Sequence, residues 1–334
     1  MITARQGSLG RRCRRFAIAA AVTGAVTVGA RAQTQSRDAV PGPAWGRSGD
    51  LKVFHVQGRV DLLVGAGGNI LVQTGDEGVL VVDTGLAMYA DKVLAAIRTL
   101  SNGPIRYIVN THVHPDHTGG NDVIGKAGST TQGNPTPIVA HENVLTRMST
   151  PIGERTLAPT AAWPTDSYVT ASKDFFFNGE PIRLFHDAAA HTDGDTIVLF
   201  RRSDVVATGD IFVTTSYPVI DLASGGGVQG VINGLNRVLD LAVPEHEQEG
   251  GTYIVPGHGR VCDEADVLEY RDMVTIVRDR VQDMIGRGLT AEQVKAARPT
   301  LDYDLRYGAT SGPWTTAMFV DAIYKDLSAK SRRR

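Results

Sequence analysis

The sequence has little cysteine, few aromatic residues and no long apolar stretch. Its 334 residues include only two Cys, which excludes a scaffold held together by disulfides. Aromatic residues make up 6% of the chain, and no apolar run reaches the roughly 20 residues that a membrane-spanning helix requires. Apolar residues account for 42% and charged residues for 21%, a balance that is typical of globular proteins and excludes extensive disorder.

Acidic residues are absent from the first 32 positions, which contain six arginines. Four of these arginines precede an uncharged stretch from Phe16 to Ala30. A basic segment, an apolar segment and the small residues of Ala30-Arg31-Ala32 are typical of a signal peptide. The paired arginines before Phe16 resemble a twin-arginine signal. We therefore expect residues 1–32 to direct export to the periplasm or to the medium, and residues 33–50 to form a linker.

The charge balance of the remaining chain is acidic. Removing the leader lowers the count of Lys and Arg from 34 to 28 against 36 Asp and Glu, which gives a formal net charge of −8 rather than −2. Nucleic acid is disfavoured as a partner, because phosphate binding requires clustered cations. The remaining Cys262 has no partner for an internal disulfide. We expect a small-molecule substrate and no membrane span after removal of the leader.

Beyond residue 50, short apolar segments separated by Gly-rich turns predict two groups of strands, each followed by helix. The segment 149–170 contains three Pro and predicts a long loop. The repeated order indicates an α/β fold in which two sheets pack between layers of helices, an αββα four-layer sandwich, over residues 51–262. Residues 263–334 predict a C-terminal helical extension that covers one sheet face or mediates homo-oligomer formation.

Three of the nine histidines lie within six consecutive residues, directly after a predicted buried strand. The segment reads His112-Val113-His114-Pro115-Asp116-His117. On an extended backbone, residues two apart point to the same side, so His112 and His114 can share one metal ion. Pro115 is expected to end the strand and to turn Asp116 and His117 toward a second position. Imidazoles with a carboxylate are ligands that suit zinc.

Three further candidate ligands each lie just beyond the end of a predicted strand. They are His191, Asp210 after Gly209, and His258 within a Pro-Gly-His-Gly segment. Small residues adjoin each of them, and we expect all of them to gather at one rim of the sandwich.

These motifs resemble the metallo-β-lactamase superfamily, and they occur in the order of that family over about residues 51–260. The resemblance rests on HVHPDH at 112–117, the later His191, Gly-Asp at 209–210 and Pro-Gly-His-Gly at 256–259. Asp83, in Val-Val-Asp-Thr-Gly, resembles the first motif of the family.

The resemblance implies two zinc ions, with iron or manganese as alternatives. The implied ligands of the first ion are His112, His114 and His191. Those of the second are Asp116, His117 and His258, with Asp210 bridging both ions. Asp83 is implied to orient a ligand histidine without touching metal. The implied reaction is hydrolysis by a hydroxide shared between the ions, with Asp116 passing the proton to the leaving group.

The resemblance also bears on the substrate. Asp210 stands where β-lactamases usually have Cys or Ser, so the chain is more similar to glyoxalase II, lactonases and other ester or thioester hydrolases. An ester, thioester, lactone or amide carbonyl, including a β-lactam, is the expected target. Tyr217 is a candidate for stabilising the oxyanion, with core packing as the alternative. A mononuclear iron sulfur dioxygenase-like oxidoreductase is the alternative function.

Overall fold

The computed structural model describes residues 50–150 and 157–331, all of which belong to one compact unit. The expected leader at 1–32 and residues 33–49 of the expected linker lie outside the described residues. None of the described helices combines the length and the hydropathy that crossing a bilayer requires.

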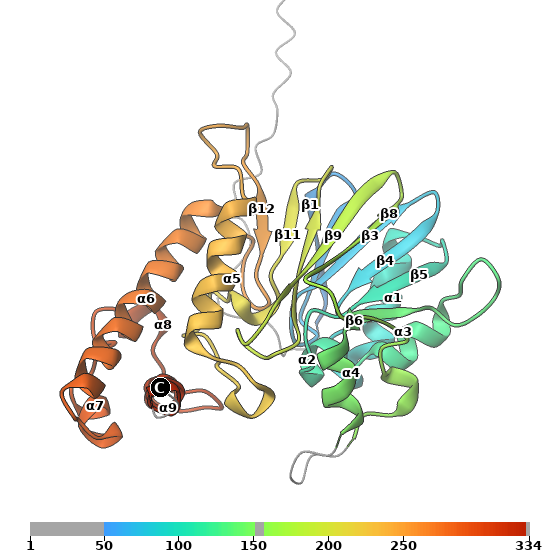
Figure 1. Ribbon diagram of the computed structural model, residues 1–334. Coiled ribbons are helices and arrows are strands. Elements are labelled where there is room, and N and C mark those ends of the chain that lie inside the picture. The colour runs from blue at the N-terminus through green and yellow to red at the C-terminus, as the bar shows by residue number, and fades with distance from the viewer. Residues whose placement is uncertain (1–49, 151–156, 332–334) are drawn as a thin grey trace, which may run out of the picture. The chain divides into compact units, whose positions relative to one another are not determined.

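Within the described residues, seven strands form the first sheet, and they follow one another across it in sequence order (Figure 1). They are β1 (Lys52–Gln57), β2 (Val60–Val64), β3 (Ile70–Gly75), β4 (Gly78–Val82), β5 (Ile105–Val109), β6 (Ile138–His141) and β7 (Asp166–Tyr168). The first four strands pair antiparallel through short turns. From β4 to β7 the pairing is parallel, since each connection is long enough to return the chain to the same end of the sheet.

The second sheet contains five strands of the described chain in the order β12-β11-β10-β9-β8. They are β8 (Ser172–Phe177), β9 (Glu180–Asp187), β10 (Asp195–Phe200), β11 (Val205–Ala207) and β12 (Tyr253–Val255). Only β11 and β12 pair parallel, because a helix connects them, and the other pairs are antiparallel.

The described helices fall into two sets that cover the outer faces of the sheets (Figure 1). They are α1 (Ala90–Leu100), α2 (Pro115–Thr118), α3 (Asn121–Ala127), α4 (Glu142–Ser149), α5 (Val228–Leu241), α6 (Glu264–Gly286), α7 (Ala291–Ala296), α8 (Asp304–Tyr307) and α9 (Thr316–Ser331). Short 3-10 turns occur at Ala87–Tyr89, Thr160–Ala162, Gly209–Ile211 and Leu222–Ser224.

Three apolar clusters identify the layers. One cluster lies between the sheets and joins residues such as Leu62 and Leu80 of the first sheet to Val198 of the second. Another packs α1 and α3 on the outer face of the first sheet. A third packs α5, α6 and α9 on the outer face of the second sheet. The predicted αββα four-layer sandwich with C-terminal helices is therefore confirmed.

The C-terminal helices share one core with the second sheet. Tyr217 stacks on Phe319 of α9 with ring centroids 4.7 Å apart, and Phe212 meets Tyr270 of α6 at 5.1 Å. All four rings are almost completely buried. The extension thus supplies the apolar residues that cover the second sheet.

The prediction of a long loop over 149–170 is wrong at its end, because β7 lies within it and pairs with β6. The sequence also gave no expectation of β8, although Phe175 and Phe177 of this strand pack against the core between the sheets. Their neighbour Phe176 points outward and is 64% exposed, so the apolar run conceals the alternation that identifies a half-buried strand.

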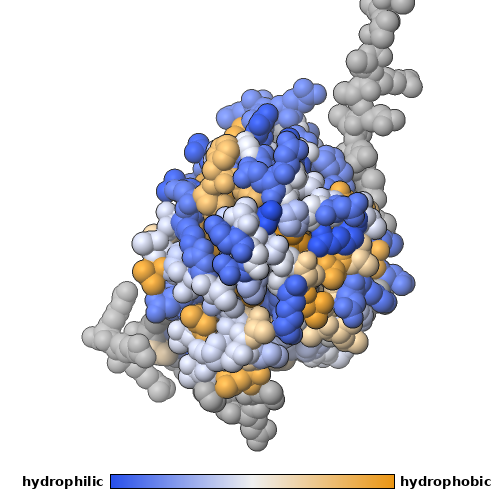
Figure 2. Space-filling model, turned by 90° about the vertical axis from the view of Figure 1, so that its right-hand side faces the viewer, coloured by the Kyte–Doolittle hydropathy of each residue, from blue (hydrophilic) through white to orange (hydrophobic). Residues whose placement is uncertain are grey.

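Polar residues dominate the surface on the side that Figure 2 shows. The hydrophobic areas on this face are small and are separated by hydrophilic residues. Such scattered apolar exposure is ordinary for globular domains and marks no interaction site by itself.

Two neighbouring residues of α9 allow the contribution of the extension to be measured. Phe319 is fully buried, whereas Met318 is 43% exposed. We expect Phe319→Ala to lower the free energy of unfolding by about 3–5 kcal/mol, since it removes a buried ring and leaves a cavity. Met318→Ala should cost about 1 kcal/mol or less, because its side chain is partly solvated already. Urea unfolding of both variants measures the difference, and equal losses would contradict a core shared with α9.

Candidate metal centre

The HVHPDH segment lies where β5 ends and α2 begins. The strand stops at Val109, so His112 lies in a bend rather than on a strand extension. His114 is the extended residue before α2, and Pro115 is the first residue of that helix. Proline is favoured at this position because its missing N–H would have no partner within the helix. Asp116 and His117 follow in the same turn, which separates them from the two preceding histidines as expected.

The structure brings the seven predicted ligands together. Their ligand atoms form three overlapping groups among the described residues, and the atoms within each group lie within 4.8 Å of one another. The groups are His112, His114 and His191; His112, His117 and Asp210; and Asp116, His117 and His258. The first and third groups match the two ligand sets that the resemblance implies, and Asp210 lies between them.

Hydrogen bonds fix the protonation of two of these histidines. Asp83 Oδ2 lies 2.7 Å from His117 Nδ1, and a carboxylate only accepts, so this nitrogen carries the proton. The hydroxyl of Thr111 donates to the same carboxylate at 2.7 Å. That hydroxyl can therefore only accept from His112 Nδ1, which lies 3.0 Å away. The Nε2 atom of His112 is left with a lone pair, and the Nε2 atom of His117 faces the centre, where Asp210 Oδ1 lies 3.2 Å away.

The same logic applies to His114 and His191. The backbone carbonyl of Val219 lies 2.7 Å from His191 Nδ1 and can only accept, so His191 Nε2 has the lone pair. The Asp221 carboxylate lies 3.0 Å from His114 Nε2, which leaves the lone pair on His114 Nδ1. These two lone-pair nitrogens face each other at 2.8 Å.

The inward nitrogens on the other side of the centre lie close to one another and to Asp210. His117 Nε2 lies 3.4 Å from His258 Nε2 and 3.2 Å from Asp210 Oδ1. His112 Nε2 is buried with no hydrogen-bond partner among the described residues. Buried polar atoms are normally satisfied, and four imidazoles with a carboxylate form the donor set of a transition-metal site. The residues present therefore fit metal ions.

Burial keeps His112 and His191 neutral. It lowers the pKa of His112 well below its ordinary value, and the neighbouring rings of His117 and His191 lower it further. Burial likewise lowers the pKa of His191 to about 4, despite the nearby Asp210 carboxylate. Both rings are therefore unprotonated at neutral pH and available to a metal ion.

Carboxylates dominate the other side of the centre. Burial alone would lower the pKa of His117, but Asp210, Asp83 and Asp116 together raise it well above its ordinary value. Burial is outweighed at His258 too, where Asp210 and Asp116 raise the pKa to about 9. Without metal these two rings hold protons, so metal ions and protons compete for them.

Asp210 is held at the centre by close backbone packing. It lies in the 3-10 turn at Gly209–Ile211 and is 8% exposed. Burial would raise its pKa, but the charges of His258 and His117 keep the pKa well below the ordinary range. A Cβ atom at Gly257 would overlap Asp210 Oδ1, so only glycine fits beside the carboxylate.

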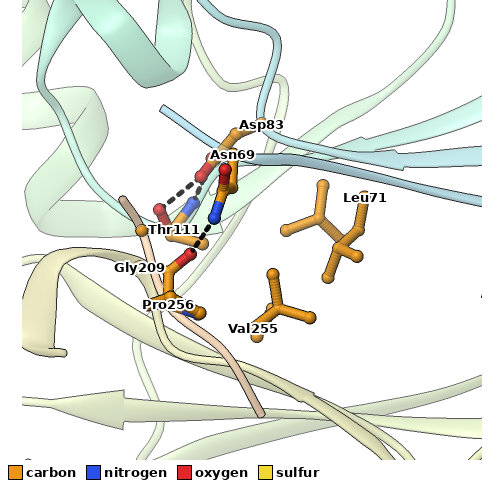
Figure 3. A pocket seen from close by; sticks show the side chains of 10 residues that line it. Asn69, Leu71, Asp83, Thr111, Gly209, Val255 and Pro256 are labelled. Carbon is orange, nitrogen blue, oxygen red and sulfur yellow. Dashed lines mark hydrogen bonds between the residues drawn. The ribbon is translucent and has the colours of Figure 1, made fainter. Parts of the chain in front are cut away.

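Asp83 supports the centre through hydrogen bonds to Thr111 and His117. It follows β4 with a φ of 61°, a conformation that non-glycine residues rarely adopt outside functional sites. In this position it holds both the backbone and hydroxyl of Thr111, as Figure 3 shows, as well as His117. Residues such as Thr111 and Pro256 line a cavity of about 10 Å³ here, which is at the lower limit for a single water. This region is tightly packed and holds the ligand residues in place, and its cavity is too small for a substrate.

Asn69 ties the turn between β2 and β3 to the segment that carries His258. Its amide donates to the carbonyl of Pro256 at 2.8 Å (Figure 3) and to that of Gly259 at 3.0 Å. Its backbone N–H donates to Gly257 O at 2.8 Å. Because its polar groups are used internally, Asn69 fixes the position of the His258 loop.

Sequence reasoning missed Thr111, Asp221 and Asn69, each of which fixes a ligand or its loop. It also placed Tyr217 in the catalytic site, and the structure contradicts this. The hydroxyl of Tyr217 donates to Thr300 O at 3.1 Å and Asp304 Oδ1 at 3.0 Å, both in the C-terminal extension. The ring is 1% exposed, so core packing is its role.

A family model described as the metallo-beta-lactamase superfamily matches residues 64–260, which is more than half of the chain. A segment of 45 residues, 13% of this chain, is 51% identical to a linear primary-alkylsulfatase from Pseudomonas sp. (strain ATCC 19151). That segment is only 8% of the alkylsulfatase.

Similar solved structures extend over more of the chain. A stereoselective inverting sec-alkylsulfatase from Pseudomonas sp. is 16% identical with a TM-score of 0.61, covering 82% of this chain and 50% of that protein. A metallo-beta-lactamase from Pontibacter korlensis is 17% identical with a TM-score of 0.54, covering 67% of this chain and 99% of that one. At these identities the likeness is one of fold. The chain spans about half the length of the alkylsulfatase structure.

The support given by Asp83 can be measured through metal affinity. We expect Asp83→Asn to weaken zinc binding by roughly 10–100-fold, since residues that orient metal ligands typically contribute that much. Competition with a chromophoric chelator measures the affinity. Asp61→Asn is the matched control, because Asp61 pairs with His55 and belongs to none of the three groups. Equal affinities for the two variants would contradict the role of Asp83.

The position of Tyr217 predicts a purely structural effect. Tyr217→Phe should lower the free energy of unfolding by about 1 kcal/mol, the typical contribution of a hydrogen bond. Zinc content and turnover should stay at the level of the unmodified protein, because the hydroxyl is directed to the extension. Urea unfolding and metal analysis of the same preparation test both statements. Lost turnover at unchanged stability would restore the catalytic role.

Proposed function

Because this chain belongs to the metallo-beta-lactamase superfamily, we propose that it is a metal-dependent hydrolase with a dinuclear zinc centre. The observation that carries the proposal is the inward direction of one ring nitrogen from each of four histidines, whose outer nitrogens are fixed by hydrogen bonds. Among these atoms, His112 Nε2 is buried without a hydrogen-bond partner in the described residues, which is costly unless a ligand such as a metal ion binds it.

The chain offers two sets of ligands for the ions. One ion would be held by His112, His114 and His191, and the other by Asp116, His117 and His258, with Asp210 shared. When bound, the ions would supply a hydroxide nucleophile at neutral pH and would polarise the bond under attack. Asp210 is the suitable bridging group, because its carboxylate lies near histidines of both sets.

Asp116 is the proposed proton carrier. Its carboxylate lies 3.2 Å from His258 Nε2, and its side chain is 29% exposed, compared with 9% for Asp210. Burial would raise its pKa, but the charge of His117 and the hydrogen bond from His258 lower the pKa below its ordinary range. Asp116 is therefore ionised at neutral pH, and its position at the exposed edge of the centre is what suits it to pass a proton to a departing oxygen, sulfur or nitrogen.

We propose the carbonyl of a small ester, thioester, lactone or amide as the target. Asp210 supports this substrate class through the resemblance to glyoxalase II and lactonases. A sulfate ester is the second candidate, favoured by the 51% identity to a linear primary-alkylsulfatase over 45 residues. Both reactions would use the same nucleophile, so the substrate is decided by what the surrounding cleft accepts.

We also propose that the protein acts in the periplasm or outside the cell. The support for this address is the Arg-rich leader expected at 1–32.

Metal analysis with a substrate panel tests the proposed function. The panel contains a p-nitrophenyl ester, a thioester, a lactone, nitrocefin and dodecyl sulfate. We expect two zinc ions per chain and hydrolysis of a carbonyl substrate, which a chelator removes and added zinc restores. His112→Ala should lower turnover by several orders of magnitude, because His112 belongs to two of the three ligand groups.

His55→Ala provides the control, since His55 is an exposed histidine paired only with Asp61. Turnover of dodecyl sulfate alone would select the sulfatase function. One iron per chain without hydrolysis would instead favour the dioxygenase alternative. Full turnover in the chelated protein or in His112→Ala would reject the metal mechanism.

A further inference from the structure

A cleft of about 380 Å³ adjoins the metal centre on the side of the C-terminal extension. Its lining residues are His114, Val219, Ile220, Asp221, Leu222, Trp314, Met318, Asp321, Ala322 and Lys325. This volume falls in the range of small-molecule sites. One side of the cleft is formed by residues 219–222, which follow Tyr217. The other side is formed by Trp314 and α9, so the C-terminal extension supplies part of the cleft.

The cleft and the metal centre share side chains. His114 contributes its Nδ1 to the first ligand group, while its ring also lines the cleft. Asp221 lines the cleft as well and holds His114 Nε2 at 3.0 Å. A molecule in the cleft therefore touches a residue that would hold a metal ion.

One face of α9 forms a continuous wall of this cleft. Met318, Asp321, Ala322 and Lys325 occupy positions i, i+3, i+4 and i+7, which places them on one side of a helix. The rise from Met318 to Lys325, seven residues further along the helix, is roughly 10 Å along the helix axis. An extended aliphatic chain of medium length can lie along a wall of this length.

The cleft combines apolar walls with charged groups that have partners in the protein, since Asp221 is bound to His114 and Asp321 to Lys325. Its walls include Val219, Ile220 and Met318, and Met318 is 43% exposed. The charge of Lys325 is paired with Asp321 at 2.6 Å, so the rim offers no free cation from this pair to an anionic tail. Removal of the apolar walls from water favours an uncharged aliphatic group.

Trp314 also lines the cleft. Its indole Nε1 is buried and has no hydrogen-bond partner among the described residues. A buried donor without a partner costs free energy, so Trp314 contributes its ring and not its N–H to the cleft.

The position of Asp116 indicates which part of the substrate faces the cleft. Asp116 belongs to the ligand group with His117 and His258, whereas His114 belongs to the other group. If the proton leaves through Asp116, the leaving group lies on the side of His258. The acyl side of the carbonyl is then directed toward His114.

We propose that the cleft between α9 and residues 219–222 binds an uncharged, medium-length aliphatic acyl chain of the substrate. This inference rests on the proposed hydrolytic function. It makes Met318 a specificity-determining residue, although Met318 does not belong to the metal centre. The C-terminal extension would then select the substrate as well as cover the second sheet.

A chain-length series of p-nitrophenyl esters tests the proposal on the zinc-loaded protein. We expect kcat/KM to rise from acetate to octanoate. Met318→Glu should lower kcat/KM for octanoate by about tenfold or more, since it places a charge against the chain, and should leave acetate nearly unchanged. Leu305→Glu is the matched control, because Leu305 is fully exposed on the same extension and does not line the cleft. Equal chain-length profiles for Met318→Glu and the unmodified protein would overturn the proposal.

A binding measurement separates this inference from the proposed function. Calorimetric titration with decanone, which cannot be hydrolysed, should give binding that is the same in zinc-loaded and chelated protein and about tenfold weaker in Met318→Glu. Decanone binding without hydrolysis of any ester would leave an apolar binding cleft but reject hydrolysis. Hydrolysis with decanone affinity unchanged by Met318→Glu would reject the cleft and retain the enzyme.

Discussion

The metal centre depends on hydrogen bonds to the outer nitrogens of its histidines. Asp83 accepts from His117 directly and fixes His112 through the hydroxyl of Thr111. Backbone carbonyl Val219 and carboxylate Asp221 fix the rings of His191 and His114. Each of these rings therefore turns its other nitrogen inward. His112 Nε2 is left buried without a hydrogen-bond partner among the described residues, and a metal ion would satisfy it, which links the fold to the proposed chemistry.

The rest of the fold holds the residues that form these hydrogen bonds in place. The ligand segments follow β5, β9, β11 and β12, so both sheets contribute to the same rim. Asn69 connects the first sheet to the loop of His258, and Gly257 leaves room for Asp210. The C-terminal helices bury the outer face of the second sheet and also form one wall of the cleft beside His114. Stability and substrate access thus involve the same helix, α9.

The sequence predicted the ligands because their chemistry leaves a local pattern. Two histidines separated by one residue, followed by proline, aspartate and a third histidine, are recognisable without knowledge of the fold. His191, Asp210 and His258 were found because each follows an apolar strand. The supporting residues Thr111, Asp221 and Asn69 leave no such pattern, since a single polar residue in a loop is ordinary until its partner is known.

Two wrong predictions have the same physical cause, because the outcome in each depends on contacts with residues far away in the sequence. Tyr217 follows Asp210 closely in sequence, but its ring stacks on Phe319, more than 100 residues away. Only tertiary packing decides between the two directions. The edge strand β7 and its successor β8 were missed because neither shows a clear alternation of apolar and polar residues. Pairing with neighbouring strands defines them instead.

Anomalous diffraction at the zinc absorption edge, from crystals grown with zinc, tests the central claim most directly. Two peaks are predicted, one bonded by His112, His114 and His191 and the other by Asp116, His117 and His258, with Asp210 between them. Peaks elsewhere on the protein, with none among these seven side chains, would contradict the claim.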